Sequence, residues 1–335
     1  MIRDGKQIIT HDDHRFIMNN AALGDMITSL PAVIFAMQNV SPEVKLTVYV
    51  PPWQVDLVAH LLAPYGKITV GSLNDVPMKI EDRREAWPES SVSMNGAIQN
   101  THTRNRVHMV DHAFNFLLDS RPENMAQRNY PTAAPLGDYR VSTPSPYVVF
   151  PIGATSDNKL LKAAVMAPIM QWCMDQGYTV VIVGTKMSHT RVQMGDKLGE
   201  QLVIRDEVDK LPADIFSRVL DMREKTTLLE LRDLLGNAAA VAGIDGGTIH
   251  LAGTTDVPIV YGMGSTLPAH RYVARHGDPS YRIRYVGPRN TECAGCQSKA
   301  VLTRWDFRNC PFGDNICMTN MSSEDFIAGL QELGL

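Results

Sequence analysis

The chain has 335 residues, of which 44% are hydrophobic and 20% charged, and its formal net charge is −4. This length fits two domains better than one core, and the composition is that of a globular protein and excludes a disordered one. The slight acidity gives no overall attraction to nucleic acid or anionic lipid. No apolar run reaches the length of a membrane span, and residues 1–10 lack the order of a signal peptide, so we expect a cytoplasmic protein.

The first half of the chain alternates strand and helix patterns. Arg15–Asn20 is a short strand-like run, and apolar residues then recur with helical spacing from Met26 to Met37. Lys45–Val50 predicts a second strand, Trp53–Leu62 a helix and Ile68–Val70 a third strand. This order is typical of a parallel sheet covered by helices.

Three polar stretches interrupt the pattern. His11–His14 precedes the first strand and is interpreted as a solvated turn. Residues 71–106 form either a loop over a cleft or a plain solvated surface, and Val107–Leu118 returns to helical spacing. Residues 130–146 hold four prolines and are the predicted linker between two domains.

The alternation restarts after the linker. Tyr147–Phe150 and Tyr178–Val183 predict strands on either side of a helix at Lys162–Gly177. Further strands are predicted at 202–204, 239–244 and 257–261, and helices at 227–235 and from 249 onward. Two such doubly wound domains leave a cleft between them, and ligands favour the carboxyl ends of the strands.

Three strand-to-helix turns hold residues with chemistry. In the first, Gly24 permits a sharp turn, and Asp25 is either a helix cap or a general base. The second, 151–159, carries Lys159 and is either a diphosphate site or an ordinary polar loop. In the third, 245–250, two glycines allow an anion to approach backbone N–H groups, although a tight turn followed by a core histidine explains it too.

The order and spacing of these turns resemble glycosyltransferase family nine, the ADP-heptose:lipopolysaccharide heptosyltransferase group. The matching motifs are G-D-x-x-x-x-x-P-A at 24–32, P-x-G-A with a following lysine at 151–159, and D-(S/T)-G-x-x-H-L-A at 245–252. The resemblance covers most of residues 15–320. It implies an α/β fold of the GT-B type, with two Rossmann-like doubly wound domains facing across a cleft. We expect an acceptor-side domain at 1–140 and a nucleotide-sugar-binding domain at 141–335.

The resemblance also implies an inverting transfer without a catalytic metal. Asp25 would be the general base, and Lys159 would stabilise the leaving diphosphate. The other implied donor-site residues are Gly24, Thr155, Ser156, Thr226, Asp245, Gly246, Gly247, Thr248 and His250. The sequence departs from the family pattern at Asn19 and Asn20, at Gly246 and after the strand ending at 183. Both an ADP-sugar and a UDP-sugar therefore stay open as donor.

Four of the five cysteines fall in the segment 293–317. Cys293, Cys296, Cys310 and Cys317 would suit a structural zinc or iron ion, and free or reversibly oxidised thiols are the alternative. Cys173 lies on an apolar helix and is predicted to be part of the core.

The acceptor cannot be chosen from the residues. A lipopolysaccharide core glycan, with peripheral membrane contact, a protein side chain and a modified nucleic acid are all compatible with the sequence. Two other functions fit the same fold, a nucleotide-sugar epimerase and a non-catalytic module that binds nucleotide or glycan. An epimerase would need acid and base groups on both domains, whereas the first domain's turns offer one carboxylate, Asp25.

Overall fold

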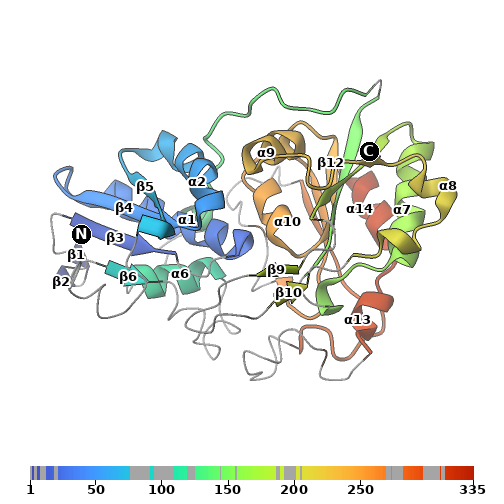
Figure 1. Ribbon diagram of the computed structural model, residues 1–335. Coiled ribbons are helices and arrows are strands. Elements are labelled where there is room, and N and C mark those ends of the chain that lie inside the picture. Colours follow the sequence, from blue (N-terminus) through green and yellow to red (C-terminus); the bar gives the residue numbers. More distant parts are fainter. Residues whose placement is uncertain are drawn as a thin grey trace. The chain divides into compact units, whose positions relative to one another are not determined.

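The computed structural model describes residues 2–3, 6–7, 13–18, 22–75, 91–93, 109–118, 125–143, 145–154, 157–185, 189–191, 201–203, 206–268, 273, 282–296, 310 and 314–335. The chain divides into two compact units. Unit 1 is Met1–Pro135 with Ala274–Asp278, and unit 2 is Leu136–Val273 with Pro279–Leu335. Each unit is built on its own parallel sheet (Figure 1).

The sheet of unit 1 has four parallel strands in the order β5-β4-β3-β6. They are β3 (Asp13–Ile17), β4 (Lys45–Val50), β5 (Thr69–Ser72) and β6 (Ser91–Ser93). Its helices among the described residues are α1 (Leu23–Asn39), α2 (Val55–Leu62) and α6 (Met109–Leu118). Alternate residues of β4 are buried, as the period of a strand requires, and α1 packs against α6 with the Phe35 and Phe114 rings 5.4 Å apart.

The first strand begins earlier than its sequence pattern indicates. Asp13 pairs with Lys45 at the start of β4, so β3 includes Asp13 and His14. His14 is buried, with its ring 4.8 Å from that of Phe16 in an edge-on arrangement. The expectation of a solvated turn is therefore wrong for Asp13 and His14, because β4 is long enough to pair with both of them. His11 and Asp12 lie outside the described residues.

The sheet of unit 2 has six parallel strands in the order β11-β8-β7-β12-β13-β14. They are β7 (Tyr147–Ile152), β8 (Thr179–Gly184), β11 (Leu220–Asp221), β12 (Ala240–Ile244), β13 (Ile259–Gly262) and β14 (Ile283–Val286). In chain order this is 3-2-1-4-5-6, the strand order of the Rossmann fold. The order reverses between β7 and β12, and this reversal is the switch point of the sheet.

Helices cover both faces of this second sheet. Figure 1 shows α7 (Ala163–Asp175) and α14 (Ser323–Glu332) on one side, and α9 (Leu228–Gly236) and α10 (Gly247–Ala252) on the other. Two short helices, α8 (Ala213–Phe216) and α13 (Ile316–Thr319), also belong to the described part of the unit. Burial on both faces explains the continuous apolar sequences of β8 and β12, and every residue of β12 is buried.

The remaining elements are small. Two antiparallel pairs form outside the main sheets, β1 (Ile2–Arg3) with β2 (Lys6–Gln7), and β9 (His189–Arg191) with β10 (Gln201–Val203). The strand expected at 202–204 thus overlaps β10, which does not join the main sheet. Single 3-10 turns occur at Pro52–Gln54, Ala63–Tyr65, Leu73–Asp75, Met125–Arg128, Asp157–Lys159 and Val208–Lys210.

Two sequence predictions concern the polar stretches 71–106 and 130–146. The first is partly wrong, because Ser72 ends β5 and Ser91–Ser93 form β6, both in the main sheet of unit 1. Of residues 71–106, the stretches 76–90 and 94–106 lie outside the described residues. The described part of the proline-rich segment 130–146 contains no helix or strand, and its first residue, Tyr130, is fully buried. Within the described ranges, no helix is long and apolar enough to cross a membrane.

Candidate functional site

Two loops leave the switch point of unit 2. The first follows β7, passes Gly153 at a φ of 100°, and ends in the 3-10 turn η5 (Asp157–Lys159). The second follows β12 and consists of Asp245 and Gly246, which lead into α10. Loops at a switch point diverge to opposite faces of the sheet and leave a crevice, the usual ligand position in this fold. Lys159 ends the first of these loops, and Asp245 begins the second.

The centre of the site is an ion pair between residues far apart in the sequence. Lys159 Nζ lies 2.7 Å from Asp245 Oδ2. The aspartate side chain is 4% exposed, whereas the lysine side chain is 29% exposed. On the other carboxylate oxygen, His250 Nε2 lies 3.3 Å from Asp245 Oδ1. The buried carboxylate is thus held by two nitrogen groups, and the lysine keeps a face toward solvent.

A third loop, which follows β13, completes the surroundings of the carboxylate. Thr266 Oγ1 donates to Asp245 Oδ2 at 3.4 Å, and Ser265 Oγ donates to the carbonyl oxygen of Asn158 at 3.4 Å. Both hydroxyl residues and Asn158 are buried. Sequence reasoning missed Ser265 and Thr266. The available signal was a Ser-Thr pair just beyond a predicted strand, at the same edge of the sheet as Asp245.

Glycines set the geometry of the β12 turn in different ways. A Cβ on Gly243 would lie 3.2 Å from Pro151 Cδ, so the close approach of β12 to the end of β7 favours glycine there. Gly246, in contrast, has an extended φ of −173°, and a Cβ on it would meet only the Ile244 carbonyl oxygen, at 3.6 Å. A serine or threonine would fit at position 246. Neither backbone nor space requires this departure from the family motif.

Asp25 lies in the first turn of α1, directly after Gly24, and its side chain is half-buried. The N-cap of α1 is Ala22, so the interpretation of Asp25 as a helix cap is wrong. An acidic residue in the first turn is favoured by the helix dipole. The Asp25 carbonyl oxygen accepts hydrogen bonds from Thr28 Oγ1 and Ser29 Oγ, both at 2.8 Å, which fix the turn that carries the carboxylate.

The other predicted site residues fall into three groups. Gly247 and Thr248 open α10 beside Asp245 and are partly exposed. Thr226 immediately precedes Thr227, the N-cap of α9, and within the described residues it neither hydrogen-bonds nor pairs with Asp245. Thr155 and Ser156 lie outside the described residues.

The arrangement suits an anionic ligand with hydroxyl groups. A partly exposed ammonium offers charge and hydrogen bonds to phosphate oxygens. A buried carboxylate accepts hydrogen bonds from sugar hydroxyls. Lys159 and Asp245 neutralise each other, which offsets much of the cost of burying the carboxylate.

The cysteine segment lies in the same unit. The Cys296 N–H donates to the Cys293 carbonyl oxygen at 3.0 Å, and Gly295 between them has a φ of 72°. Burial, and then the neighbouring thiols of Cys293, Cys296 and Cys310, raise the pKa of Cys317 to about 12. In the described part of the chain, no three His, Cys, Asp or Glu side chains are grouped closely enough to hold a metal ion.

The fifth cysteine has a different environment. Cys173 is fully buried on α7, as predicted, and burial raises the pKa of its thiol to about 12. It belongs to the core of unit 2.

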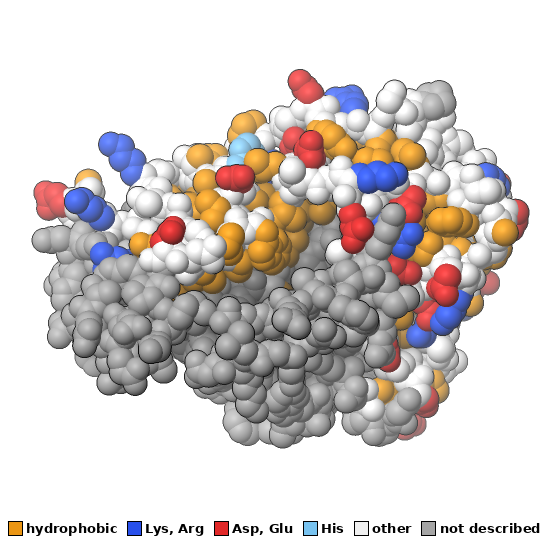
Figure 2. All heavy atoms as spheres, viewed as in Figure 1, with side chains coloured by type: hydrophobic (Ala, Val, Ile, Leu, Met, Phe, Trp, Pro, Cys, Tyr) orange, Lys and Arg blue, Asp and Glu red, His pale blue; other side chains and the backbone are white. Residues whose placement is uncertain are grey.

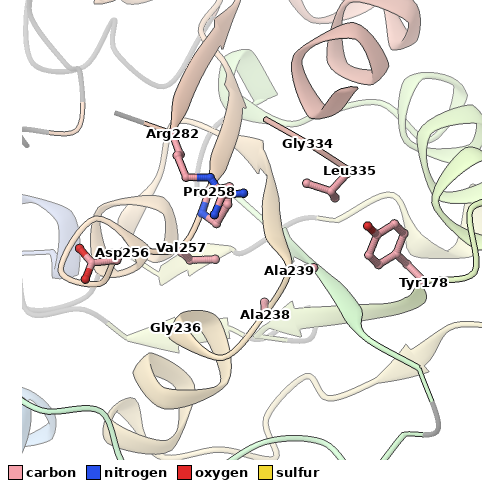
Figure 3. A pocket seen from close by; sticks show the side chains of 10 residues that line it. All are labelled: Tyr178, Gly236, Ala238, Ala239, Asp256, Val257, Pro258, Arg282, Gly334 and Leu335. Carbon is pink, nitrogen blue, oxygen red and sulfur yellow. The ribbon is translucent and has the colours of Figure 1, made fainter. Parts of the chain in front are cut away.

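A cavity of about 360 Å³ lies elsewhere in unit 2 (Figure 3). Its walls include Ala238 and Ala239 before β12, Val257 and Pro258 before β13, and Arg282 before β14. It therefore occupies the amino edge of the sheet, opposite the carboxyl edge that carries Asp245. None of its lining residues belongs to the candidate site.

Two Rossmann-type parallel sheets define a doubly wound α/β architecture, and solved structures share it. The iron-containing dodecameric glycosyltransferase TibC from enterotoxigenic E. coli is 19% identical, with 96% of this chain and 75% of that chain covered at a TM-score of 0.65. E. coli ADP-heptose lps heptosyltransferase II is 14% identical, with 95% and 99% covered at 0.61. E. coli heptosyltransferase WaaC with ADP is 14% identical, with 96% and 100% covered at 0.56. These are GT-B structures, so the predicted fold class is confirmed.

The family follows from the sequence itself. The model of glycosyltransferase family 9 (heptosyltransferase) matches residues 81–272, more than half of the chain. The chain belongs to glycosyltransferase family 9 and is a glycosyltransferase, which confirms the resemblance drawn from its three turns. Among curated proteins there is no significant match.

Proposed function

We propose that the protein transfers a heptose-type sugar from an ADP-sugar to an acceptor hydroxyl with inversion at the anomeric carbon. The observation that carries the proposal is the Lys159–Asp245 pair at the switch point of unit 2. ADP is proposed over UDP because WaaC is described with ADP and a TibC complex with ADP-D-beta-D-heptose. Family membership favours sugar transfer over epimerisation and over a non-catalytic binding module.

The donor-site residues have separate roles in this proposal. Lys159 turns from Asp245 to the diphosphate and stabilises the negative charge that grows on it as the sugar departs. Asp245, held by His250 and Thr266, accepts hydrogen bonds from sugar hydroxyls. The N–H groups of Gly246, Gly247 and Thr248 face the phosphates. Thr155, Ser156 and Thr226 remain proposed neighbours of the donor.

The chemical step needs one base, and we assign it to Asp25. Its carboxylate accepts the proton of the acceptor hydroxyl, whose oxygen attacks the anomeric carbon from the face opposite the diphosphate. The new carbon–oxygen bond forms while the bond to the β-phosphate oxygen breaks, and its electron pair leaves with ADP. The products are the inverted glycoside, ADP and a proton on Asp25.

For the acceptor, we propose a glycan hydroxyl such as that of a lipopolysaccharide core. Heptosyltransferase II, to which the chain is similar in fold, is described as acting on lipopolysaccharide. On the face shown in Figure 2, lysine and arginine side chains of the described residues stand next to aspartate and glutamate and do not form a one-sign patch. The net charge of −4 favours a glycan over a polyanionic nucleic acid. A protein hydroxyl is the alternative that an acceptor screen would detect.

We also propose a structural metal, zinc or iron, on Cys293, Cys296, Cys310 and Cys317. The donor set fits, because four thiolates suit a tetrahedral site and the first pair forms a tight turn around Gly295. TibC is described as iron-containing. The thiols are neighbours without being grouped for coordination, so metal binding would have to draw them together. Such an ion would hold the segment in place.

Donor binding tests the proposed function directly. Titration calorimetry with ADP and with UDP should show tighter binding of ADP, and Lys159→Ala should weaken it by one to two orders of magnitude, about 1.4 to 3 kcal/mol. Lys162→Ala is the matched control, because Lys162 lies three residues further on and pairs with Glu207 at 3.3 Å. Equal affinities in both variants would contradict the placement of the diphosphate. Preference for UDP would overturn the choice of donor.

A further inference from the structure

The loop after β13 has two sides, and one of them faces the donor site. Ser265 and Thr266 donate their hydroxyl hydrogens to Asn158 and Asp245 respectively. Asn158 directly precedes Lys159 in the 3-10 turn η5. The position of this loop therefore sets the surroundings of both members of the Lys159–Asp245 pair.

The other side of the same loop rests on the cysteine segment. The Gly295 N–H, in the turn between the first two cysteines, donates to the Gly264 carbonyl oxygen at 2.8 Å. A Cβ on Gly264 would lie 3.0 Å from Cys317 Sγ and 2.1 Å from Met318 Cε. Gly264 thus leaves the space that Cys317 fills. The two ends of the cysteine segment meet at one residue, which directly precedes Ser265.

A second contact joins the cysteine segment to the donor site. Helix α13, which carries Cys317, packs against η5, which carries Lys159. Leu267, in the same loop as Gly264, also lies against the turn at Gly295, since a Cβ on Gly295 would lie 2.3 Å from Leu267 Cδ2. Through α13 the segment therefore touches the turn that carries Lys159, and through Gly264 it touches the loop whose Thr266 donates to Asp245.

We propose that metal binding at Cys293, Cys296, Cys310 and Cys317 and diphosphate binding at Lys159 and Asp245 are linked, so that each strengthens the other. The inference rests on the proposed function. An ion that draws the four thiols together fixes Gly295 and Cys317 against Gly264, and so fixes Ser265 and Thr266 beside Asp245. Because the metal has already ordered these loops, donor binding loses less conformational entropy and is therefore tighter.

Linkage of this kind is reciprocal, and that gives a sharp test with Zn²⁺ and ADP as probes. The full-length protein is kept reduced with a phosphine and compared in metal-free and Zn²⁺-loaded forms. We expect ADP to bind about 5- to 150-fold tighter to the loaded form. Competition with a chelator should show that saturating ADP raises the affinity for Zn²⁺ by the same factor. Equal ADP affinities in the two forms would overturn the linkage.

Two variants separate the linkage from general damage. Cys310→Ser removes one thiol without touching the contacts at Gly264, and it should bind ADP like the metal-free protein whether or not Zn²⁺ is added. Cys173→Ala removes a buried thiol outside the segment and should keep the full effect of Zn²⁺. Circular dichroism checks that both variants fold. Retention of the Zn²⁺ effect in Cys310→Ser would contradict the proposal.

The experiment also distinguishes failure of the proposed function from failure of the linkage. If Zn²⁺ binds with one ion per chain but ADP binds neither form, the donor assignment is wrong and the inference falls with it. If ADP binds and Zn²⁺ does not, the donor assignment stands and the linkage is overturned.

Discussion

Asp25 is the residue whose replacement most directly tests the chemistry. Asp25→Asn keeps the size of the side chain and its place in the first turn of α1, but it cannot accept the acceptor's proton. We expect kcat to fall by about 10²- to 10⁴-fold while the Kd of ADP stays within twofold, because the base acts on the acceptor. Steady-state kinetics and calorimetry on the same preparation measure both quantities. Near-full turnover would show that another group is the base.

The glycines of unit 2 differ in what they tolerate, and stability measurements should show it. Gly246→Ala meets no obstacle, but Gly246 is the N-cap of α10, so the weaker capping by alanine should offset its restriction of the unfolded chain, and the free energy of unfolding should change by less than about 1 kcal/mol. Gly184→Ala should destabilise strongly, since Gly184 has a φ of 137° and an added Cβ would lie 2.2 Å from the Ile152 carbonyl oxygen. Urea unfolding of the two variants provides the comparison. If the two variants lost equal free energy of unfolding, the difference in space at Gly246 and Gly184 would be contradicted.

At the scale of elements, Glu207 fastens the start of α7 to the turn Val208–Lys210. It accepts from Lys210 Nζ at 3.0 Å, from Lys162 Nζ at 3.3 Å and from the Ala163 N–H at 3.4 Å. Burial alone would raise the pKa of Glu207, but the hydrogen bonds from Lys210 and Ala163 and the charge and hydrogen bond of Lys162 outweigh it and hold the pKa below 4.5. Stability from the ionised carboxylate is therefore present at neutral pH.

Glu207→Gln should lower the free energy of unfolding by about 1–3 kcal/mol at pH 7. A lowered pKa means that this contribution is lost as the pH falls through the folded-state value, below 4.5, so the difference from the wild type should vanish in acid. Glu332→Gln is the control, because Glu332 pairs with Arg284 on the surface and is 61% exposed. Denaturant unfolding at several pH values measures both, and a difference that does not shrink as the pH falls would contradict the assignment.

The sequence predicts the elements whose apolar residues repeat over several turns of a helix or form an alternating or continuous stretch in a strand. Lys45–Val50 is found with the predicted bounds, and α1, α7 and β8 differ at their ends by a few residues. Of the described main-sheet strands, the sequence analysis missed β6, β11 and β14. β6 has three residues inside a stretch interpreted as a loop or a solvated surface. Leu220–Asp221 is too short to show a period, and β14 is an edge strand with Tyr285 exposed among charged neighbours.

For the site, motif spacing indicated Lys159, Asp245 and His250 but not their contacts. Thr266 meets Asp245 because β13 lies next to β12, and Lys159 meets it because β7 lies on β12's other side. Strand order is a long-range property of the sheet, and the period of a single segment does not contain it. The hydroxyls of the third loop therefore could be assigned only from the fold.

At the scale of the whole molecule, the two units have separate sheets and separate cores, so a ligand held by unit 2 should stabilise that unit first. A ligand at 100 times its Kd stabilises the state that binds it by about 2.7 kcal/mol. We expect saturating ADP to slow hydrogen exchange of the backbone amides in β7 and β12, and to leave β3 and β4 unchanged. Mass spectrometry of peptides from these strands measures both units in one experiment. Lys159→Ala should abolish the protection of β7 and β12. Equal protection of the strands of unit 1 would mean that the units open together, and donor affinity would then depend on the stability of the entire chain.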